Sequence, residues 1–234
     1  MDDFLITRKK RYATNIILID GFSGTGKTLI SDILMASNKI SVVQCEALLD
    51  YLPIAYEFKG IKEDASISLL INRLDEIAYN LFIGRNTNIR VGDASSVIRH
   101  PSRFDYIKSL FINPPEDSYI ENASKNLHIP IWSHATSFNN NLYEKAFGER
   151  IKILYTLRDP IFSVQNHSDY TKRITGTPRD WQLNYTINGK EYPWYAKDWE
   201  DEFSKCNETE ISIILLNRGY ESLFSKLNKS NIIS

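Results

Sequence analysis

The feature that most restricts the fold of this chain is a glycine-rich segment at residues 21–28. It reads Gly-Phe-Ser-Gly-Thr-Gly-Lys-Thr and fits the pattern G-x-x-x-x-G-K-[ST] at every position. An apolar run, Ile16 to Ile19, precedes the segment, and a helical pattern over residues 29–35 follows it. Because glycine tolerates positive φ angles, the segment can curl sharply. The sequence therefore predicts a buried strand, a compact loop and a helix in direct succession.

This loop has the residues of a phosphate-binding site. Its glycines allow successive backbone N–H groups to point at phosphate oxygens, and the following helix adds the partial positive charge of its N-terminus. Lys27 would bring a mobile charge to the β- and γ-phosphates, and Thr28 would offer a hydroxyl to Mg²⁺. A plain glycine-rich turn is the alternative, which the complete pattern disfavours. The predicted nucleotide-binding residues are Gly21, Ser23, Gly24, Thr25, Gly26, Lys27 and Thr28.

Short apolar runs alternate with helical patterns along the whole chain. Strands are predicted at 16–19, 40–43, 88–91, 129–132, 151–155 and 211–216, and the clearest helix at 66–83. This alternation is typical of an α/β fold with a mostly parallel central sheet flanked by helices. Asn188-Gly189 predicts a small hairpin excursion. We expect a single domain over residues 1–234, with a lid or insertion at about 165–195.

The loop in this context resembles the P-loop nucleoside-triphosphate-binding superfamily. The motif covers a small part of the chain, and the strand–helix alternation extends the resemblance loosely over the rest. The resemblance implies a three-layer P-loop fold and binding of ATP with Mg²⁺.

Two carboxylates follow predicted strands and are candidates for roles beside the nucleotide. Asp93 could accept a Mg²⁺-bound water, or it could cap a helix that begins near Ala94. Glu46 ends the second apolar run, where small-molecule kinases often place the residue that takes the proton of the acceptor hydroxyl. A solvated loop charge is the alternative for Glu46.

A second constellation lies between residues 129 and 168. One predicted strand ends in Ser133-His134 and the next leads into Arg158-Asp159-Pro160. This resembles the sulfotransferases, a resemblance that implies His134 as catalytic base and Arg158 as a ligand of the donor's 3′-phosphate. A histidine satisfied within the core is the alternative for His134. Two positions depart from that family, because Phe22 stands where its loop has lysine and Asn166 where serine is expected.

The same region also resembles nucleoside and nucleotide kinases, in which a strand is followed by a helix and a basic lid. Arg173, with Lys172 and Arg179, could form that lid and neutralise charge on the transferring phosphoryl group. A solvated basic loop is the alternative.

Composition excludes several classes of protein. The net charge is −1, with 28 basic and 29 acidic residues, so no field of the whole protein attracts nucleic acid. No apolar run approaches the roughly 20 residues needed to span a bilayer. Cys45 and Cys206 cannot form a disulfide framework, which favours the cytoplasm.

The sequence as a whole predicts a kinase that transfers the γ-phosphoryl group of ATP to a hydroxyl of a small molecule. Lys27, Arg158, Glu46 and His134 are its candidate catalytic residues, and Thr28 with Asp93 its candidate Mg²⁺ ligands. The alternative is a sulfotransferase that uses 3′-phosphoadenylyl sulfate, a histidine base and no metal. The identity of the acceptor and the oligomeric state stay open.

Overall fold

The computed structural model describes residues 5–9, 11–112, 117–134 and 141–227. Its contacts divide the chain into two compact units. The sheet unit consists of Met1–Asp20, Lys27–Ser133 and Asn139–Tyr155, and the helix–hairpin unit consists of Gly21–Gly26, His134–Phe138 and Thr156–Ser234. The glycine-rich loop thus belongs to the second unit, and the helix that follows it belongs to the first.

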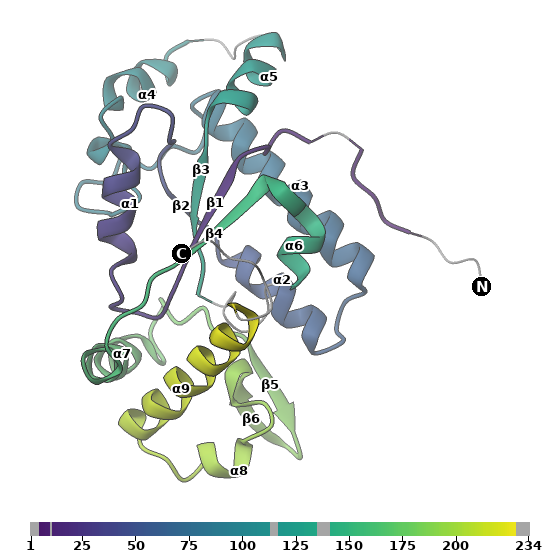
Figure 1. Ribbon diagram of the computed structural model, residues 1–234, viewed down its shortest axis with the longest axis vertical. Coiled ribbons are helices and arrows are strands. Elements are labelled where there is room, and N and C mark those ends of the chain that lie inside the picture. Colours follow the sequence, from purple (N-terminus) through teal and green to yellow (C-terminus); the bar gives the residue numbers. More distant parts are fainter. Residues whose placement is uncertain (1–4, 10, 113–116, 135–140, 228–234) are drawn as a thin grey trace. The chain divides into compact units, whose positions relative to one another are not determined.

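The sheet unit is built on a four-stranded, all-parallel sheet in the order β2-β3-β1-β4 (Figure 1). The strands are β1 (Ile16–Asp20), β2 (Gln44–Cys45), β3 (Ile129–Trp132) and β4 (Ile151–Tyr155). In the register of the sheet, Ile16 lies between Ile129 and Ile151. Because every strand runs in the same direction, the carboxyl ends of all four meet at one edge.

Helices cover both faces of this sheet because successive side chains of a strand point to opposite sides. Ile16 and Leu18 pack with α2 (Ala47–Glu57), α3 (Glu63–Phe82) and α6 (Asn141–Phe147). Ile17 packs instead on Met35 at the end of α1 (Lys27–Met35). The unit is completed by η1 (Val97–Arg99), α4 (Arg103–Ser109), α5 (Asp117–Asn126) and η2 (Gly148–Arg150).

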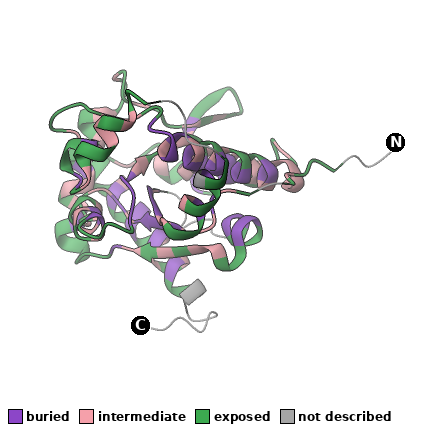
Figure 2. Ribbon diagram, turned by 90° about the horizontal axis from the view of Figure 1, so that it is seen from above, coloured by how far each residue is buried: buried purple, intermediate pink, exposed green. Residues whose placement is uncertain are grey.

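The long helix α3 forms the largest part of the core opposite the sheet. Leu70, Leu74, Ile77 and Ala78 recur at helical spacing, and each is at most 6% exposed. Figure 2 shows buried residues concentrated in the sheet and along this helix. The prediction of a helix over 66–83 is therefore confirmed, with its start three residues earlier at Glu63.

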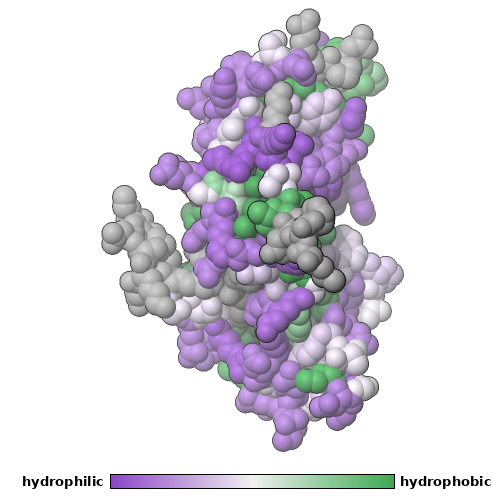
Figure 3. Space-filling view, turned by 90° about the vertical axis from the view of Figure 1, so that its right-hand side faces the viewer, coloured by the Kyte–Doolittle hydropathy of each residue, from purple (hydrophilic) through white to green (hydrophobic). Residues whose placement is uncertain are grey.

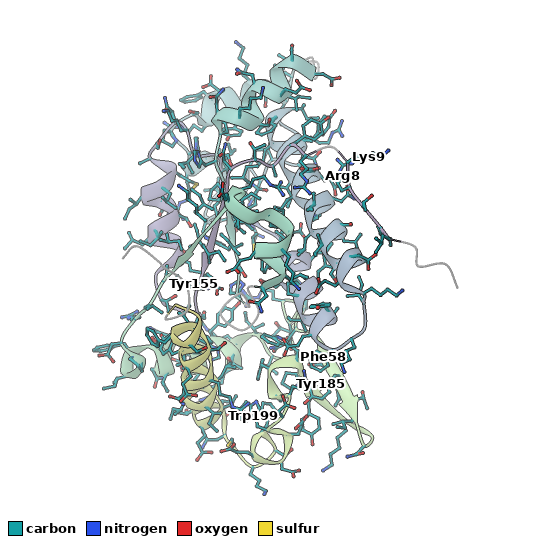
Figure 4. The ribbon with its side chains drawn as sticks, turned by 45° about the vertical axis from the view of Figure 1, so that its right-hand side comes forward. Arg8, Lys9, Phe58, Tyr155, Tyr185 and Trp199 are labelled. Atoms are coloured by element: carbon teal, nitrogen blue, oxygen red, sulfur yellow. The ribbon has the colours of Figure 1, made fainter. Side chains whose placement is uncertain are left out.

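The helix–hairpin unit contains α7 (Pro160–Ile174), β5 (Asn184–Ile187), β6 (Lys190–Pro193), η3 (Trp194–Ala196), α8 (Glu200–Phe203) and α9 (Glu208–Leu227). The predicted hairpin is confirmed, since Asn188 and Gly189 both have positive φ, at 51° and 75°. Trp199, labelled in Figure 4, is 5% exposed and packs edge-on against Phe203. The aromatic residues near the hairpin thus form a core.

In addition to the hairpin, three of the six predicted strands are confirmed, at 16–19, 129–132 and 151–155. The other three strand predictions are wrong. Residues 211–216 lie in α9, because a run of six apolar residues fits a buried helix as well as a strand. Residues 88–91 form coil and turn, and the strand expected at 40–43 is instead β2, with only a bridge at Ile40.

Polar residues predominate on the face drawn in Figure 3, with small hydrophobic areas between them. Across the described ranges, every helix is too short or too polar to cross a lipid bilayer.

Candidate phosphate-binding site

The glycine-rich loop connects the last residue of β1 to the first residue of α1, as its pattern predicts. All three glycines have positive φ, at 148° for Gly21, 84° for Gly24 and 104° for Gly26. A Cβ on Gly21 would lie 2.2 Å from Thr156 Oγ1, and one on Gly24 would lie 2.7 Å from Asn166 Cβ. No atom lies within 4 Å of the position of a Cβ on Gly26, so the backbone there borders open space.

Two carbonyl groups of the loop are occupied by protein donors within the helix–hairpin unit. Phe22 O accepts from Thr25 Oγ1 at 2.8 Å, and Gly24 O accepts from Arg158 Nη1 at 3.0 Å. The Thr25 hydroxyl also lies 2.7 Å from the hydroxyl of Thr156. A loop that presents N–H groups to an anion must turn its carbonyl oxygens elsewhere, and these contacts do so.

The phenyl ring of Phe22 anchors the loop in a small hydrophobic cluster. It is 7% exposed and packs edge-on against His167 and Tyr220, with ring centroids 5.9 and 5.6 Å away. This explains the departure from the sulfotransferase pattern, because the position expected to carry lysine holds a core residue.

Among the predicted phosphate-binding arginines, Arg158 is joined to the loop and Arg173 is not. Arg158 is exposed, lies 5.7 Å from the centroid of the Phe162 ring and donates to Gly24 O. Arg173 lies in the last turn of α7, where its Nε donates to Asp169 O at 3.2 Å. Arg158 therefore combines a contact to the loop with access from solvent.

Lys27 is the first residue of α1 and lies at the carboxyl edge of the sheet. Burial lowers the pKa of its ammonium group to about 8, against the opposing attraction of Asp20, Asp50 and Cys45. Asp20, the last residue of β1, is fully buried. A lysine with this pKa carries its charge at neutral pH and is easily discharged above pH 8.

Asp50 in the first turn of α2 completes this charged group within the sheet unit. Ser133, directly after β3, donates its hydroxyl to Asp50 Oδ1 at 2.5 Å. Burial, with the charges of Asp50 and Asp20, raises the pKa of Tyr143 well above its usual value, so the phenol stays neutral. Sequence reasoning missed Asp20 and Asp50, although the place of Asp20 at a strand end before the loop was a usable signal.

The base of α1 is tied to the sheet through a short chain of hydrogen bonds. Trp132 Nε1 donates to Ser31 Oγ at 2.6 Å, and Ser31 Oγ donates to Lys27 O at 2.8 Å. Thr28, in the same turn, is exposed. The end of β3 thus fixes the turn of helix that carries Lys27 and Thr28.

Glu46 caps α2, and both its carboxylate oxygens have protein partners. Oε1 accepts from Leu48 N at 3.3 Å, and Oε2 accepts from Arg73 Nη2. His134 is an exposed residue directly after Ser133, and the residues that follow it, 135–140, lie outside the described ranges. The structure therefore gives Glu46 a local structural role and leaves His134 accessible to solvent.

Asp93 lies in the loop between α3 and η1, not at the end of a strand as expected. Its carboxylate accepts from Asn88 Nδ2 at 3.3 Å and lies 3.8 Å from Arg90 Nε. The alternative of a helix cap near Ala94 is also wrong, since η1 begins at Val97 and is capped by Ser96. Within the described part of the chain, no cluster of three or more His, Cys, Asp or Glu side chains could hold a metal ion.

No protein-family profile, no curated protein and no solved structure matches this chain.

Proposed function

We propose that this protein is a P-loop kinase that transfers the γ-phosphoryl group of ATP to a hydroxyl of a small molecule. One observation carries the proposal: the complete glycine-rich pattern lies between the carboxyl end of β1 and the N-terminus of α1, with all three glycines at positive φ. Ligands of open α/β sheets bind outside the carboxyl ends of the strands. The sheet unit would then be the core of a three-layer P-loop fold.

The nucleotide would be held by the loop and by the start of α1. N–H groups of residues 21–26 and the ammonium of Lys27 would bind the phosphates, with Ser23 and Thr25 lining the loop. Thr28 is the residue that fits Mg²⁺, because its exposed hydroxyl supplies the oxygen ligand that this hard cation prefers. A bound Mg²⁺ would neutralise phosphate charge. The loop position of Asp93 gives no support to a metal role for that residue.

Asp50 is the best-supported proton acceptor for the substrate hydroxyl. It lies in the same group of charges as Lys27, and the Ser133 hydroxyl holds one of its oxygens. Glu46 is less suited, because both its oxygens have partners. In the step, the hydroxyl proton passes to the carboxylate as the new O–P bond forms, and the bond between the γ-phosphorus and the bridging oxygen breaks to release ADP. Arg158, which donates to Gly24 O of the loop, would neutralise charge on a phosphate bound by that loop.

The test compares Lys27→Ala with the control Lys39→Ala, which removes an exposed lysine from the same unit. MgATP at 100 times its Kd should stabilise the wild-type protein by about 2.7 kcal/mol and raise its Tm by several degrees. Lys27→Ala should show no such rise in Tm, and its affinity for the nucleotide should be at least about 100-fold lower. Lys39→Ala should behave as wild type. A full MgATP shift in Lys27→Ala would contradict the proposal.

A sulfotransferase is the second candidate, and two observations favour it. Arg158 contacts the loop, and His134 is exposed directly after β3, in the places that the resemblance implies for the 3′-phosphate ligand and the base. Adenosine 3′,5′-bisphosphate would then raise the Tm without magnesium, and MgATP would not. The reverse result supports the kinase.

A further inference from the structure

Residues 84–112, which follow α3 and include η1 and α4, form a surface layer with many exposed apolar side chains. The exposed fractions are 83% for Val91, 70% for Phe104 and 84% for Phe111. Ile89, Leu110 and Ile112 are 44–58% exposed. So many exposed apolar side chains within one short, folded segment make it a candidate interaction site.

This 84–112 layer is a folded structure rather than a loose loop. Val97 N donates to Asn88 O at 2.8 Å, which closes the first half of the layer on itself. The two ends of the layer also meet. A Cβ on Gly84 would lie 1.9 Å from Ser109 Oγ, so the first residue of the layer is in direct contact with the end of α4. The exposed apolar residues therefore project from a fixed base.

Histidine 100 attaches the layer to the amino-terminal edge of the sheet. His100 is 2% exposed, its Nε2 lies 2.9 Å from Ile40 O, and Ile40 bridges to His128 just before β3. Lys27 and Asp50 lie at the carboxyl edge of the same sheet. Figure 1 shows α4 near the amino-terminal ends of the strands. A partner bound to the layer would therefore leave the carboxyl edge of the sheet unit accessible.

The charge of the layer is opposite in sign to that of the remaining chain. It contains five basic residues, Arg85, Arg90, Arg99, Arg103 and Lys108, against the acidic Asp93 and Asp105. Its formal net charge is +3, whereas the net charge of the whole chain is −1. Asp32 of α1 pairs with Arg99 and offsets one of these positive charges, so the layer stays positive. Arg103 lies 4.9 Å from the centroid of the exposed Phe104 ring, so a cation and an aromatic group are presented together.

We propose that the 84–112 layer binds the surface of an anionic lipid bilayer. Apolar side chains would enter the boundary between headgroups and acyl chains, and Arg103 and Lys108 would bind lipid phosphates and carboxylates. A second copy of the chain would bring the same positive layer against itself in a two-fold contact, which charge repulsion disfavours. Nucleic acid would not use exposed aliphatic side chains such as Val91 and Ile112, which cannot stack on bases as aromatic rings do.

The experiment measures co-sedimentation of the full chain with vesicles of phosphatidylcholine alone or with 30% phosphatidylserine. We expect binding to the anionic vesicles only, and weaker binding as salt rises from about 50 to 500 mM. Phe104→Asp with Phe111→Asp should lower the partition coefficient at least tenfold. The matched control Ile213→Asp changes a residue of α9 that is 50% exposed, and should bind as wild type.

A second pair of variants separates charge from apolar insertion. Arg103→Glu with Lys108→Glu should abolish the preference for phosphatidylserine, whereas Lys190→Glu with Lys205→Glu, at exposed positions of the other unit, should retain it. The proposal is overturned if the wild-type chain binds neither vesicle or both equally, or if the layer variants bind as wild type. A third outcome would assign the layer to another partner. In that case the wild-type chain does not bind vesicles, but it self-associates or binds a DNA oligonucleotide, and Phe111→Asp abolishes that binding.

Discussion

Two carboxylates on adjacent helices of the sheet unit differ in burial and in their hydrogen-bond donors. They are Asp75 of α3 and Asp50 of α2. Asp75 is 2% exposed and accepts from Tyr12 N at 2.7 Å, Ala13 N at 3.0 Å and Arg8 Nε at 3.1 Å. Asp50 is half-buried, accepts from the Ser133 hydroxyl and acts electrostatically on Lys27. Figure 4 labels Arg8 beside α3.

The difference shows how a structural carboxylate can be told from a candidate catalytic one. Two of the donors to Asp75 are backbone N–H groups of the segment that leads into β1. The interaction therefore fixes the chain, and the carboxylate keeps little hydrogen-bonding capacity for a ligand. Around Asp50 the partners are a rotatable hydroxyl and an ammonium group with a lowered pKa. Perturbed titratable groups of this kind gather at functional sites. Mutation should therefore separate the two carboxylates by activity and by stability.

The largest effect is expected from Asp50→Asn, which keeps the shape of the side chain and removes its capacity to take a proton. If Asp50 accepts the proton of the substrate hydroxyl, kcat should fall by about 10³-fold, within the usual range for a general base. Steady-state kinetics and a thermal melt measure activity and stability separately. If Asp50→Asn had a normal kcat, Asp50 would not be a catalytic carboxylate, and its proposed difference in role from Asp75 would be contradicted.

Asp75→Ala should have the next largest effect, on stability. It leaves two backbone N–H groups without their acceptor, at a cost of about 3 kcal/mol, or about 100-fold in the unfolding constant. Asp75→Asn retains one acceptor oxygen and should cost about half as much. Urea denaturation of both variants provides the measurement, and equal stability of Asp75→Ala and wild type would refute the structural role.

The pKa of Lys27 near 8 predicts a smaller, pH-dependent effect on nucleotide binding. Above pH 8 the free protein loses the lysine proton that the phosphates require, so affinity for ATP should fall by up to about tenfold per pH unit. Stability of the free protein should change in the other direction. The unfolded chain keeps the proton up to the ordinary lysine pKa of 10.5, so the free energy of unfolding rises between about pH 8 and pH 10.

Titration calorimetry in buffers of different ionisation enthalpy tests this prediction, because binding at pH 8 should take up about half a proton. Lys27→Met is the control and should show no uptake from this group. Affinity that is unchanged between pH 7 and 9 in the wild-type protein would be inconsistent with a role for the Lys27 charge.

The smallest effect on turnover is expected from Glu46→Gln. The amide retains an oxygen that can cap α2, so a loss of about 1 kcal/mol in stability and a change of less than about threefold in kcat should result. A loss of turnover as large as that of Asp50→Asn would transfer the proton-accepting role to Glu46. Kinetics of the two variants under one set of conditions decide between them.

Local patterns predicted the elements that carry most of the site. The loop at 21–28 and the strands at 16–19, 129–132 and 151–155 were readable because their chemistry is local, as were α3 and the Asn188-Gly189 turn. The strand prediction at 211–216 is wrong because a short apolar run is compatible with a buried strand and with a buried helix alike. Asp93 was misplaced because residues 88–91, predicted as a strand, form coil and turn.

The sequence by itself determined a curled glycine loop followed by a lysine at the start of a helix, because backbone freedom and residue spacing are local properties. Only the tertiary structure decided which other groups surround that lysine. Asp20, Asp50 and Ser133 come from β1, α2 and the end of β3, and they converge because parallel strands end at one edge of the sheet. The pKa of Lys27 follows from that convergence, since desolvation and neighbouring charge depend on distances that spacing along the chain does not encode.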